Sequence, residues 1–360
     1  MRIALAHPLY WPEVRRGSER VVHDLGTGLA ARGHEVTVLT THPGRSTEAV
    51  EGGVRVRRLS RPPPLPGLGL YELYLETIPR LAWELRRGGF DVVHAFYLST
   101  AFGAVEARRI GGPPVVYSFH GIPTRTYLVA RRRRVWMLQR ALRGAALTTV
   151  LSEAAAAPFR RYLGFDPEIL PAGVDLTAFA PGERDPSPSI FCASAFTDPR
   201  KRVPMLLESF AALRSARPEA RLRLSEVPGG DAPAVPEGVD WVPAGSEDAL
   251  ARCYGESWAT VLPSVDEAQG LVLLESLASG TPVVASRSGF PPEVLDGAPS
   301  AGRLFEPDSG EDLTRAMAEA LDLAALPETV AACRSRAAEF SWDALLPRHE
   351  ALYERALGAP

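Results

Sequence analysis

The sequence predicts an α/β protein of two domains, each a parallel β-sheet covered by helices. The chain has 360 residues, which is enough for two domains that each bury a core of their own. Short apolar runs of strand length alternate with helical segments in both halves, a pattern typical of parallel strands joined by crossover helices. Residues 171–188 are rich in proline and glycine and separate the two halves.

The first half contains six apolar runs that predict strands, at 2–7, 35–40, 54–59, 91–96, 115–119 and 146–151. We expect helices between them at about 19–31, 71–87, 99–109 and 130–143. Ser18 is a candidate N-cap of the first helix, and Gly33 follows its end. These elements define a first domain at residues 1–172.

The second half repeats the alternation, with strands expected at 190–195, 221–225, 240–243, 260–262 and 283–285. Helices are expected at 206–216, 248–254 and 270–279, and a last helix at about 341–357 has Ser341 as a natural N-cap. Gly280 can adopt the left-handed turn that ends a helix, and Pro282 prevents its continuation. We place the second domain at residues 185–340 and a hinge at 173–184.

The segment 260–286, TVLPSVDEAQGLVLLESLASGTPVVAS, carries the most specific chemical signal. A helix that begins near Gly270 has free N–H groups in its first turn, which bind anions such as a pyrophosphate. Glu267 and Glu275, with seven residues between them, flank this helix start. Carboxylates repel phosphate, so they should face neutral groups such as sugar hydroxyls. Two isolated glutamates would more often be solvated side chains, but the connected glycine, proline and glutamate pattern is more specific than either one.

This segment resembles the donor-site signature of retaining GT-B glycosyltransferases, in particular glycosyltransferase family 4. The resemblance implies two Rossmann-like domains that face a cleft, with the C-terminal helix, residues 341–360, crossing back to the N-terminal domain. It also implies that Glu267 lies by the transferred sugar and that Glu275 binds the ribose hydroxyls. The residues that would supply backbone amides to the sugar and phosphate are Ala268, Gln269, Gly270 and Leu271. Gln269 stands where an aromatic residue is common, a difference that bears on the choice of sugar.

Lys201 is the one lysine of the chain, beside 39 arginines, which suggests that a compact ammonium is needed at this place. An exposed lysine present by chance is the alternative. The resemblance implies that Lys201 neutralises the donor pyrophosphate together with an arginine, but Ala195 occupies the arginine position. Arg200 or Arg202 could replace it. The chain has no Asp-x-Asp triplet, so we expect no metal. We expect no cofactor either, because the nucleotide diphosphate sugar is a co-substrate.

Two further positions in the first half match the family. Gly17, preceded by Arg16 where relatives carry a second glycine, lies in the loop that meets donor phosphate or acceptor in the family. This loop lacks the G-x-G-x-x-G pattern of nicotinamide-binding proteins. His120 follows the strand at 115–119, and the resemblance implies that it lies by the transferred sugar or the acceptor. A lone histidine is otherwise more often structural, and we interpret the other six histidines in this way.

Charge is distributed unevenly along the chain. Residues 1–172 carry 24 arginines against 14 acidic residues, whereas residues 173–360 carry 16 basic against 29 acidic residues. The basic half would suit an anionic partner such as a membrane surface, an anionic lipid or a phosphorylated acceptor. Complementary domain faces would explain the asymmetry equally well. The run 131–134, before Val135 and Trp136, fits a membrane-bound amphipathic helix, but a solvated face on a packed helix is the usual explanation. No nucleic-acid-binding motif is present.

The sequence therefore predicts a hexosyltransferase-type enzyme of class EC 2.4. It would move a sugar from a nucleotide diphosphate sugar to an acceptor hydroxyl, with retention and without a metal. His120, Glu267 and Lys201 are the predicted catalytic residues. The alternatives are a non-catalytic nucleotide-sugar-binding protein, an epimerase on the same fold and, most remotely, an oxidoreductase. Three scattered cysteines, the absence of a long apolar run and a start directly on a strand suggest a cytoplasmic protein, with peripheral contact to the inner membrane face as a further expectation.

Overall fold

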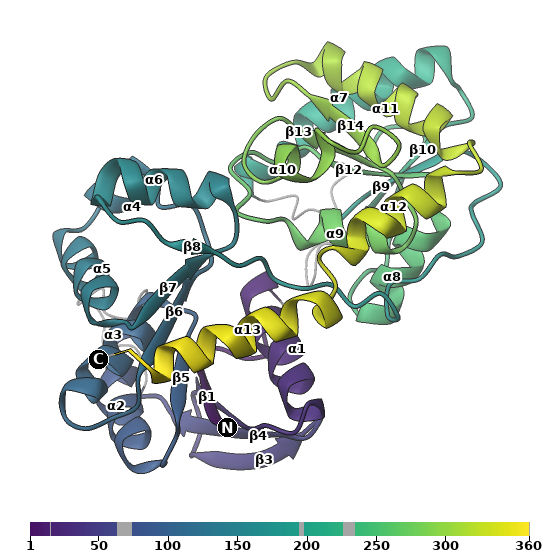
Figure 1. Cartoon of the computed structure of the whole chain (residues 1–360). Coiled ribbons are helices and arrows are strands. Elements are labelled where there is room, and N and C mark those ends of the chain that lie inside the picture. Colours follow the sequence, from purple (N-terminus) through teal and green to yellow (C-terminus); the bar gives the residue numbers. More distant parts are fainter. Residues whose placement is uncertain (15, 63–73, 194–197, 226–234, 360) are drawn as a thin grey trace. The chain divides into compact units, whose positions relative to one another are not determined.

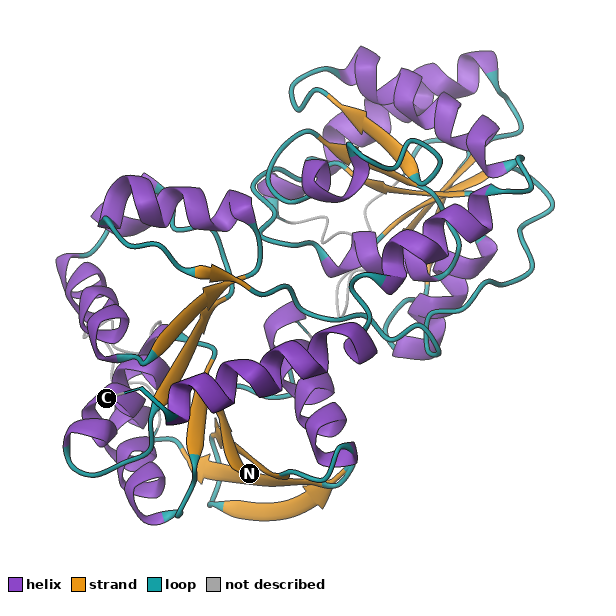
Figure 2. Cartoon of the chain, viewed as in Figure 1, coloured by secondary structure: helices purple, strands orange, loops and turns teal. Residues whose placement is uncertain are grey.

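The structure is a computed structural model that describes residues 1–14, 16–62, 74–193, 198–225 and 235–359. The chain divides into two compact units. Unit 1 consists of Met1–Gly173 with Trp342–Pro360, and unit 2 consists of Val174–Ser341 (Figure 1). Both are α/β, with helices on the faces of a largely parallel sheet (Figure 2). Among the described helices, none has the combination of length and hydropathy that a bilayer-spanning helix requires.

Unit 1 contains an eight-stranded sheet in the order β3-β4-β2-β1-β5-β6-β7-β8. Its strands are β1 Arg2–Ala6, β2 Glu35–His42, β3 Thr47–Glu51, β4 Val54–Ser60, β5 Val92–Ala95, β6 Val115–Phe119, β7 Leu147–Val150 and β8 Glu168–Ile169. The six predicted strands are present. Two strands were not predicted: β3, an exposed strand that pairs with β4 in antiparallel orientation, and the two-residue β8.

The helices of unit 1 are α1 Gly17–Ala31, α2 Ile78–Arg87, α3 Leu98–Arg109, α4 Arg125–Val129, α5 Arg132–Gly144, α6 Glu153–Leu163 and α13 Trp342–Leu357, with a 3-10 turn η2 at Leu75–Thr77. The helix expected at 130–143 is confirmed as α5, and the short helix α4 before it was not predicted. One prediction was wrong in detail. Ser18 does not cap α1, because the helix begins at Gly17 and the Ser18 hydroxyl donates to Glu19 Oε2 at 2.9 Å. The first three residues of the helix expected at 71–87 lie outside the described residues.

The C-terminal helix α13 is part of unit 1, where it packs against α1, β5 and β6. Its apolar face, which includes Leu346 and Tyr353, is buried, and a Cβ on Gly28 of α1 would lie 2.8 Å from Leu346 Cδ1. Glu350 accepts hydrogen bonds from Arg32 Nε at 2.8 Å and is 2.9 Å from His34 Nε2. These contacts attach the C-terminal helix α13 to α1 and the neighbouring strands of unit 1.

Unit 2 contains a six-stranded parallel sheet in the order β11-β10-β9-β12-β13-β14. Its strands are β9 Ser189–Cys192, β10 Arg221–Ser225, β11 Val239–Val242, β12 Ala259–Leu262, β13 Val283–Ser286 and β14 Gly302–Phe305. Its helices are α7 Val203–Ala216, α8 Glu247–Glu256, α9 Leu271–Ala278, α10 Pro291–Leu295, α11 Gly310–Ala324 and α12 Thr329–Ala338, with a 3-10 turn η3 at Pro199–Lys201. Two apolar clusters fill the sheet's faces, one beneath α8, α9 and α12 and the other beneath α7 and α11.

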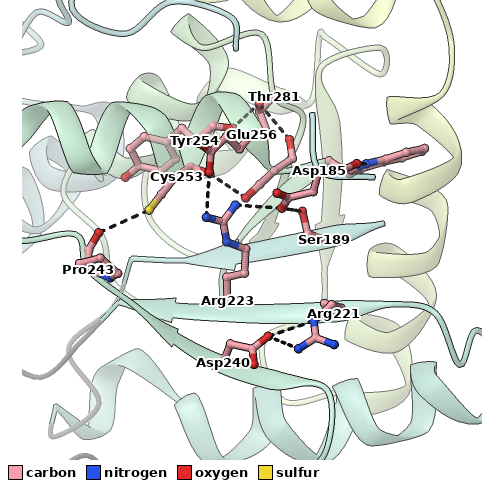
Figure 3. A network of polar contacts seen from close by, with 12 residues as sticks. Asp185, Ser189, Arg221, Arg223, Asp240, Pro243, Cys253, Tyr254, Glu256 and Thr281 are labelled. Carbon is pink, nitrogen blue, oxygen red and sulfur yellow. Dashed lines mark hydrogen bonds and ion pairs between the residues drawn. The ribbon is translucent and has the colours of Figure 1, made fainter. Parts of the chain in front are cut away.

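A half-buried ion network fixes the segment that leads into β9 (Figure 3). Arg223 on β10 donates to Asp185 Oδ2 at 2.8 Å and to Glu256 Oε2, at the end of α8, at 2.9 Å. Asp185 also accepts from the Ser189 hydroxyl at 2.6 Å, and Trp258 Nε1 donates to its carbonyl at 2.9 Å. One arginine therefore holds three segments of unit 2 together.

Candidate functional site

The unit from β12 to β13 has the strand–loop–helix–strand form that the sequence predicts. Gly270 lies directly before α9 with a φ of 72°, in the left-handed region that favours glycine. Gly280 follows the end of α9 with a φ of 73°, and Thr281 N donates to Ser276 O at 3.0 Å. The predicted start and end of the helix are confirmed to within a residue.

The loop that carries Glu267 is held by the segment after β13. Phe290 N donates to Glu267 O at 2.9 Å, and Asp266 N donates to Ser288 Oγ at 3.1 Å. Gly289 has a φ of 75°, and a Cβ there would lie 2.3 Å from Glu267 O. Only glycine fits this contact without a backbone shift. Gly289 was not predicted, although a glycine shortly after a buried strand and directly before Phe290 was a usable signal.

Lys201 and Glu267 are in contact. The Lys201 ammonium lies 2.6 Å from Glu267 Oε1, and the two side chains are 23% and 19% exposed. Lys201 ends η3, the turn after β9, whereas Glu267 follows β12, and these two strands are neighbours in the sheet. Val265 N donates to Arg200 O at 3.3 Å, which ties the two loops together. Two predicted site residues, 66 residues apart, therefore meet at the carboxyl edge of the sheet, where ligands of open α/β sheets bind.

The two arginines considered as replacements at position 195 both have acidic partners. Arg200 pairs with Asp198 at 2.7 Å, and the hydrogen bond from Arg200 holds the pKa of Asp198 below its usual value. Arg202 pairs with Asp308 at 2.9 Å, and its guanidinium also donates to Pro307 O. Ala195 itself lies outside the described residues.

Glu275 is buried in the middle of α9 and accepts a hydrogen bond from Tyr254 Oη at 2.9 Å. Tyr254, at the end of α8, is fully buried, and its ring packs against Phe179 and Phe191 with centroid distances of 5.9 and 5.3 Å. The tyrosine therefore fixes the orientation of the Glu275 carboxylate. No sequence signal distinguishes Tyr254 from any other core aromatic residue.

The remaining residues of the predicted amide-supplying loop lie between these two glutamates. Ala268, Gly270 and Leu271 are partly exposed, whereas the Gln269 side chain is buried. Partial exposure keeps the start of α9 accessible from solvent, as an anion site at a helix N-terminus requires.

His120 and Gly17 are in unit 1. His120 follows β6, its ring lies edge-on to Phe96 at 5.3 Å, and its Nδ1 is buried with no hydrogen-bond partner among the described residues. Burial lowers the pKa of His120 to about 3, with further contributions from His7 and His349. The imidazole is therefore neutral near pH 7. Gly17 is the first residue of α1.

His7, which the sequence analysis interpreted as structural, resembles His120 in its position. It follows β1, is buried, and burial lowers its pKa. Its Nδ1 lies 2.7 Å from Leu9 O, and its Nε2 has no hydrogen-bond partner within the described parts of the chain. By contrast, both ring nitrogens of His94 have partners, Tyr353 Oη at 2.8 Å and Ser118 Oγ at 2.7 Å.

Comparisons with known proteins agree with this arrangement. The family model described as Glycosyltransferase Family 4 matches residues 15–178, and that of Glycosyl transferases group 1 matches residues 187–322. A D-inositol 3-phosphate glycosyltransferase of Arthrobacter is 30% identical over 312 residues, which are 76% of this chain and 74% of the relative. An MMP alpha-(1->4)-mannosyltransferase of Mycolicibacterium hassiacum is 30% identical over 301 residues, covering 76% and 72% of the two chains.

Solved structures show the same fold. A sucrose-phosphate synthase from Thermosynechococcus elongatus superposes with a TM-score of 0.84 at 23% identity, covering 99% of both chains. The Anabaena protein HepE, in complex with UDP-glucose, gives a TM-score of 0.76 at 16% identity, covering 98% of this chain and 99% of HepE. The two parallel-sheet units, the matched family models and the 30% identical relatives show that this chain is a GT-B glycosyltransferase of family 4.

Proposed function

We propose that the protein transfers a sugar from a nucleotide diphosphate sugar to an acceptor hydroxyl, with retention at the anomeric carbon and without a metal ion. The observation that carries the proposal is the Lys201–Glu267 contact at the carboxyl edge of the unit 2 sheet. This contact brings one cation and one carboxylate together near the N-terminus of α9. The cation suits the phosphates of such a donor, and the carboxylate suits its sugar hydroxyls.

Lys201 is suited to hold the donor phosphates. An ammonium group has three N–H donors, so Lys201 can keep its contact with Glu267 and still donate to a phosphate oxygen. Negative charge grows on the leaving phosphate during transfer, and a fixed cation with helix amides stabilises that charge more than it stabilises the ground state. This positive charge also supports a reaction that needs no metal.

The two glutamates would bind the neutral parts of the donor. Glu267 can accept hydrogen bonds from hydroxyls of the transferred sugar, and Glu275, oriented by Tyr254, from the ribose. His120 would contribute a neutral imidazole, which can donate from one nitrogen and accept at the other. Its role at the sugar or the acceptor is proposed from the family resemblance and from its Nδ1, which has no hydrogen-bond partner in the described parts of the chain.

The nature of both substrates is also a proposal. HepE structures that contain UDP and UDP-glucose support a nucleotide diphosphate donor. The name of one relative contains inositol 3-phosphate, and residues 1–172 carry a net charge of +10, from 24 arginines and 14 acidic residues. These observations support an anionic or lipid-linked acceptor. The three cysteines are free and buried, which supports a cytoplasmic site of action.

A thermal-shift screen of the full chain against nucleoside diphosphates and their sugars, followed by turnover assays, tests the proposal. We expect one nucleotide to raise the melting temperature and the matching sugar nucleotide to be consumed only with an acceptor. Chelation of divalent ions should leave the rate unchanged, and NMR of the product should show the donor's anomeric configuration. Binding without turnover would instead indicate a non-catalytic binding protein, and donor conversion without acceptor would indicate an epimerase.

A further inference from the structure

The positive charge of unit 1 is concentrated in one part of its sequence. Residues 78–144, from α2 to α5, contain twelve arginines and three acidic residues, a net charge of +9. This accounts for nearly all of the net +10 of residues 1–172. The helices α2, α3 and α5 share one apolar cluster over one face of the sheet, with α3 in contact with both others (Figure 1). The charge is therefore carried by one helical layer.

A groove of about 400 Å³ runs between α3 and α5 in this layer. Its polar and aromatic lining, which we call the α3–α5 face, consists of Arg108, Arg109, Trp136, Gln139, Arg140 and Arg143. The two helices approach closely because α5 ends at Gly144, where a Cβ would lie 2.2 Å from Val105 Cγ1.

The arginines of the α3–α5 face are only partly neutralised. Glu106 pairs with Arg140 at 2.8 Å and with Arg109 at 3.3 Å, and the Arg140 hydrogen bond lowers its pKa. Arg108 and Arg143 have no ion-pair partner within the residues that the structure describes. Four arginines therefore face one carboxylate, and the groove retains positive charge that a phosphate group could neutralise.

Trp136 adds a large apolar group to the same face. Its side chain is 58% exposed, although its ring packs on Phe102 with a centroid distance of 5.3 Å. Ile110, directly after α3, is also exposed. An exposed indole flanked by arginines is the composition of surfaces that lie in the interface of an anionic membrane, where the ring enters the headgroup region and the cations meet lipid phosphates.

We propose that the α3–α5 face docks the protein on an anionic lipid bilayer, with lipid phosphates in the groove and Trp136 in the headgroup layer. An anionic membrane would neutralise the two arginines that lack an ion-pair partner among the described residues and would also accommodate the exposed indole. A soluble anion would satisfy only the arginines. The proposal concerns a surface outside the Lys201–Glu267 site, so it can fail or hold independently of the proposed transfer reaction.

Co-sedimentation of the full chain with vesicles tests the proposal. We expect binding to vesicles of equimolar phosphatidylcholine and phosphatidylglycerol, little binding to phosphatidylcholine alone, and a loss of binding as salt is added. The double variant Arg108→Glu/Arg143→Glu should bind at least about 30-fold more weakly, since each basic residue near the surface contributes roughly a fivefold factor. The double variant Arg45→Glu/Arg161→Glu, at two other exposed positions of unit 1, makes the same change in net charge and should bind like the parent.

The indole is tested separately. Trp136→Ala should weaken vesicle binding several-fold, whereas Tyr162→Ala should not. Tyr162 is an exposed aromatic residue on α6, outside the layer formed by α2, α3 and α5. Circular dichroism melts confirm that each variant is folded. Equal binding to both vesicle types, or equal losses in the two double variants, would overturn the proposal. The proposal would also be overturned if inorganic phosphate raised the melting temperature of the parent but not of Arg108→Glu/Arg143→Glu, and the parent bound no vesicles.

Discussion

Replacing Lys201 by methionine should remove the central charge of the proposed donor site. The change preserves most of the side chain's length and apolar stem but deletes the ammonium that lies 2.6 Å from Glu267 Oε1. In the variant, the Glu267 carboxylate would face the donor phosphates without a cation between them. Because both side chains are only about one fifth exposed, solvent would screen this repulsion incompletely.

The expected loss follows from these contacts. A charge-assisted hydrogen bond to a phosphate that is partly withdrawn from water is worth about 2–3 kcal/mol, so kcat/KM for the donor should fall roughly 30- to 150-fold. Initial-rate kinetics with varied donor give this value, and calorimetric titration with the nucleoside diphosphate gives the binding part. If Lys201 acts mainly on the growing charge of the leaving group, kcat should fall more than nucleotide affinity.

A matched control separates this effect from the loss of any ion pair. Arg221 pairs with Asp240 at 2.5 Å on the surface of the same unit, with both side chains about half exposed. Arg221→Ala removes a pair worth about 0–1 kcal/mol and should leave the kinetics unchanged. Parent-like kcat/KM and nucleotide affinity in Lys201→Met would refute the assignment of Lys201 to the donor phosphates.

Three further predictions concern the donor site and the two cores. Glu275→Ala should weaken nucleotide binding and transfer together, and unaltered affinity and rate in titration and kinetics would remove Glu275 from the site. Gly289→Ala should lower the melting temperature more than Gly164→Ala, because both have a positive φ but only Gly289 would bring a Cβ within 2.3 Å of backbone; equal losses would argue against the clash. Burial lowers the pKa of His349 from 6.5 to about 3. Between these two pH values the unfolded state binds one proton more than the folded state, so the free energy of unfolding should decrease as the pH is lowered below about 6.5. His349→Phe should reduce this slope in melts recorded across that range, and an unchanged slope would contradict the reasoning.

Much of the fold could be predicted from the sequence because buried parallel strands are continuous apolar runs. β12 and β13 are of this kind. The limits of α9 could be predicted because glycine favours the positive φ that Gly270 and Gly280 both adopt. β3 was missed because its residues, TEAVE, are polar and exposed, as befits an edge strand with no core to cover. Its antiparallel pairing with β4 follows from the Gly52-Gly53 turn, which was visible in the sequence.

The composition of the candidate site could be predicted only in part. The family signature supplied Glu267, Glu275 and Lys201, but their spatial relation depends on the order of the strands. Lys201 meets Glu267 because β9 and β12 are neighbours, and no local pattern specifies that pairing. Tyr254 was unpredictable for a similar reason, since a tyrosine in an amphipathic helix gives no indication that its hydroxyl will reach a carboxylate on the next helix.

The attachment of α13 to unit 1 has a consequence for how the chain forms during synthesis. Residues 174–341 are continuous in sequence, so unit 2 can close as soon as they have left the ribosome. Unit 1 starts before unit 2 in the chain but remains incomplete after unit 2 has emerged, because Leu346, Glu350 and Tyr353 follow unit 2. Until then, the faces of α1 and β5 that these residues cover are open to water and to other apolar surfaces. Synthesis of unit 1 therefore starts before that of unit 2 and is completed after it.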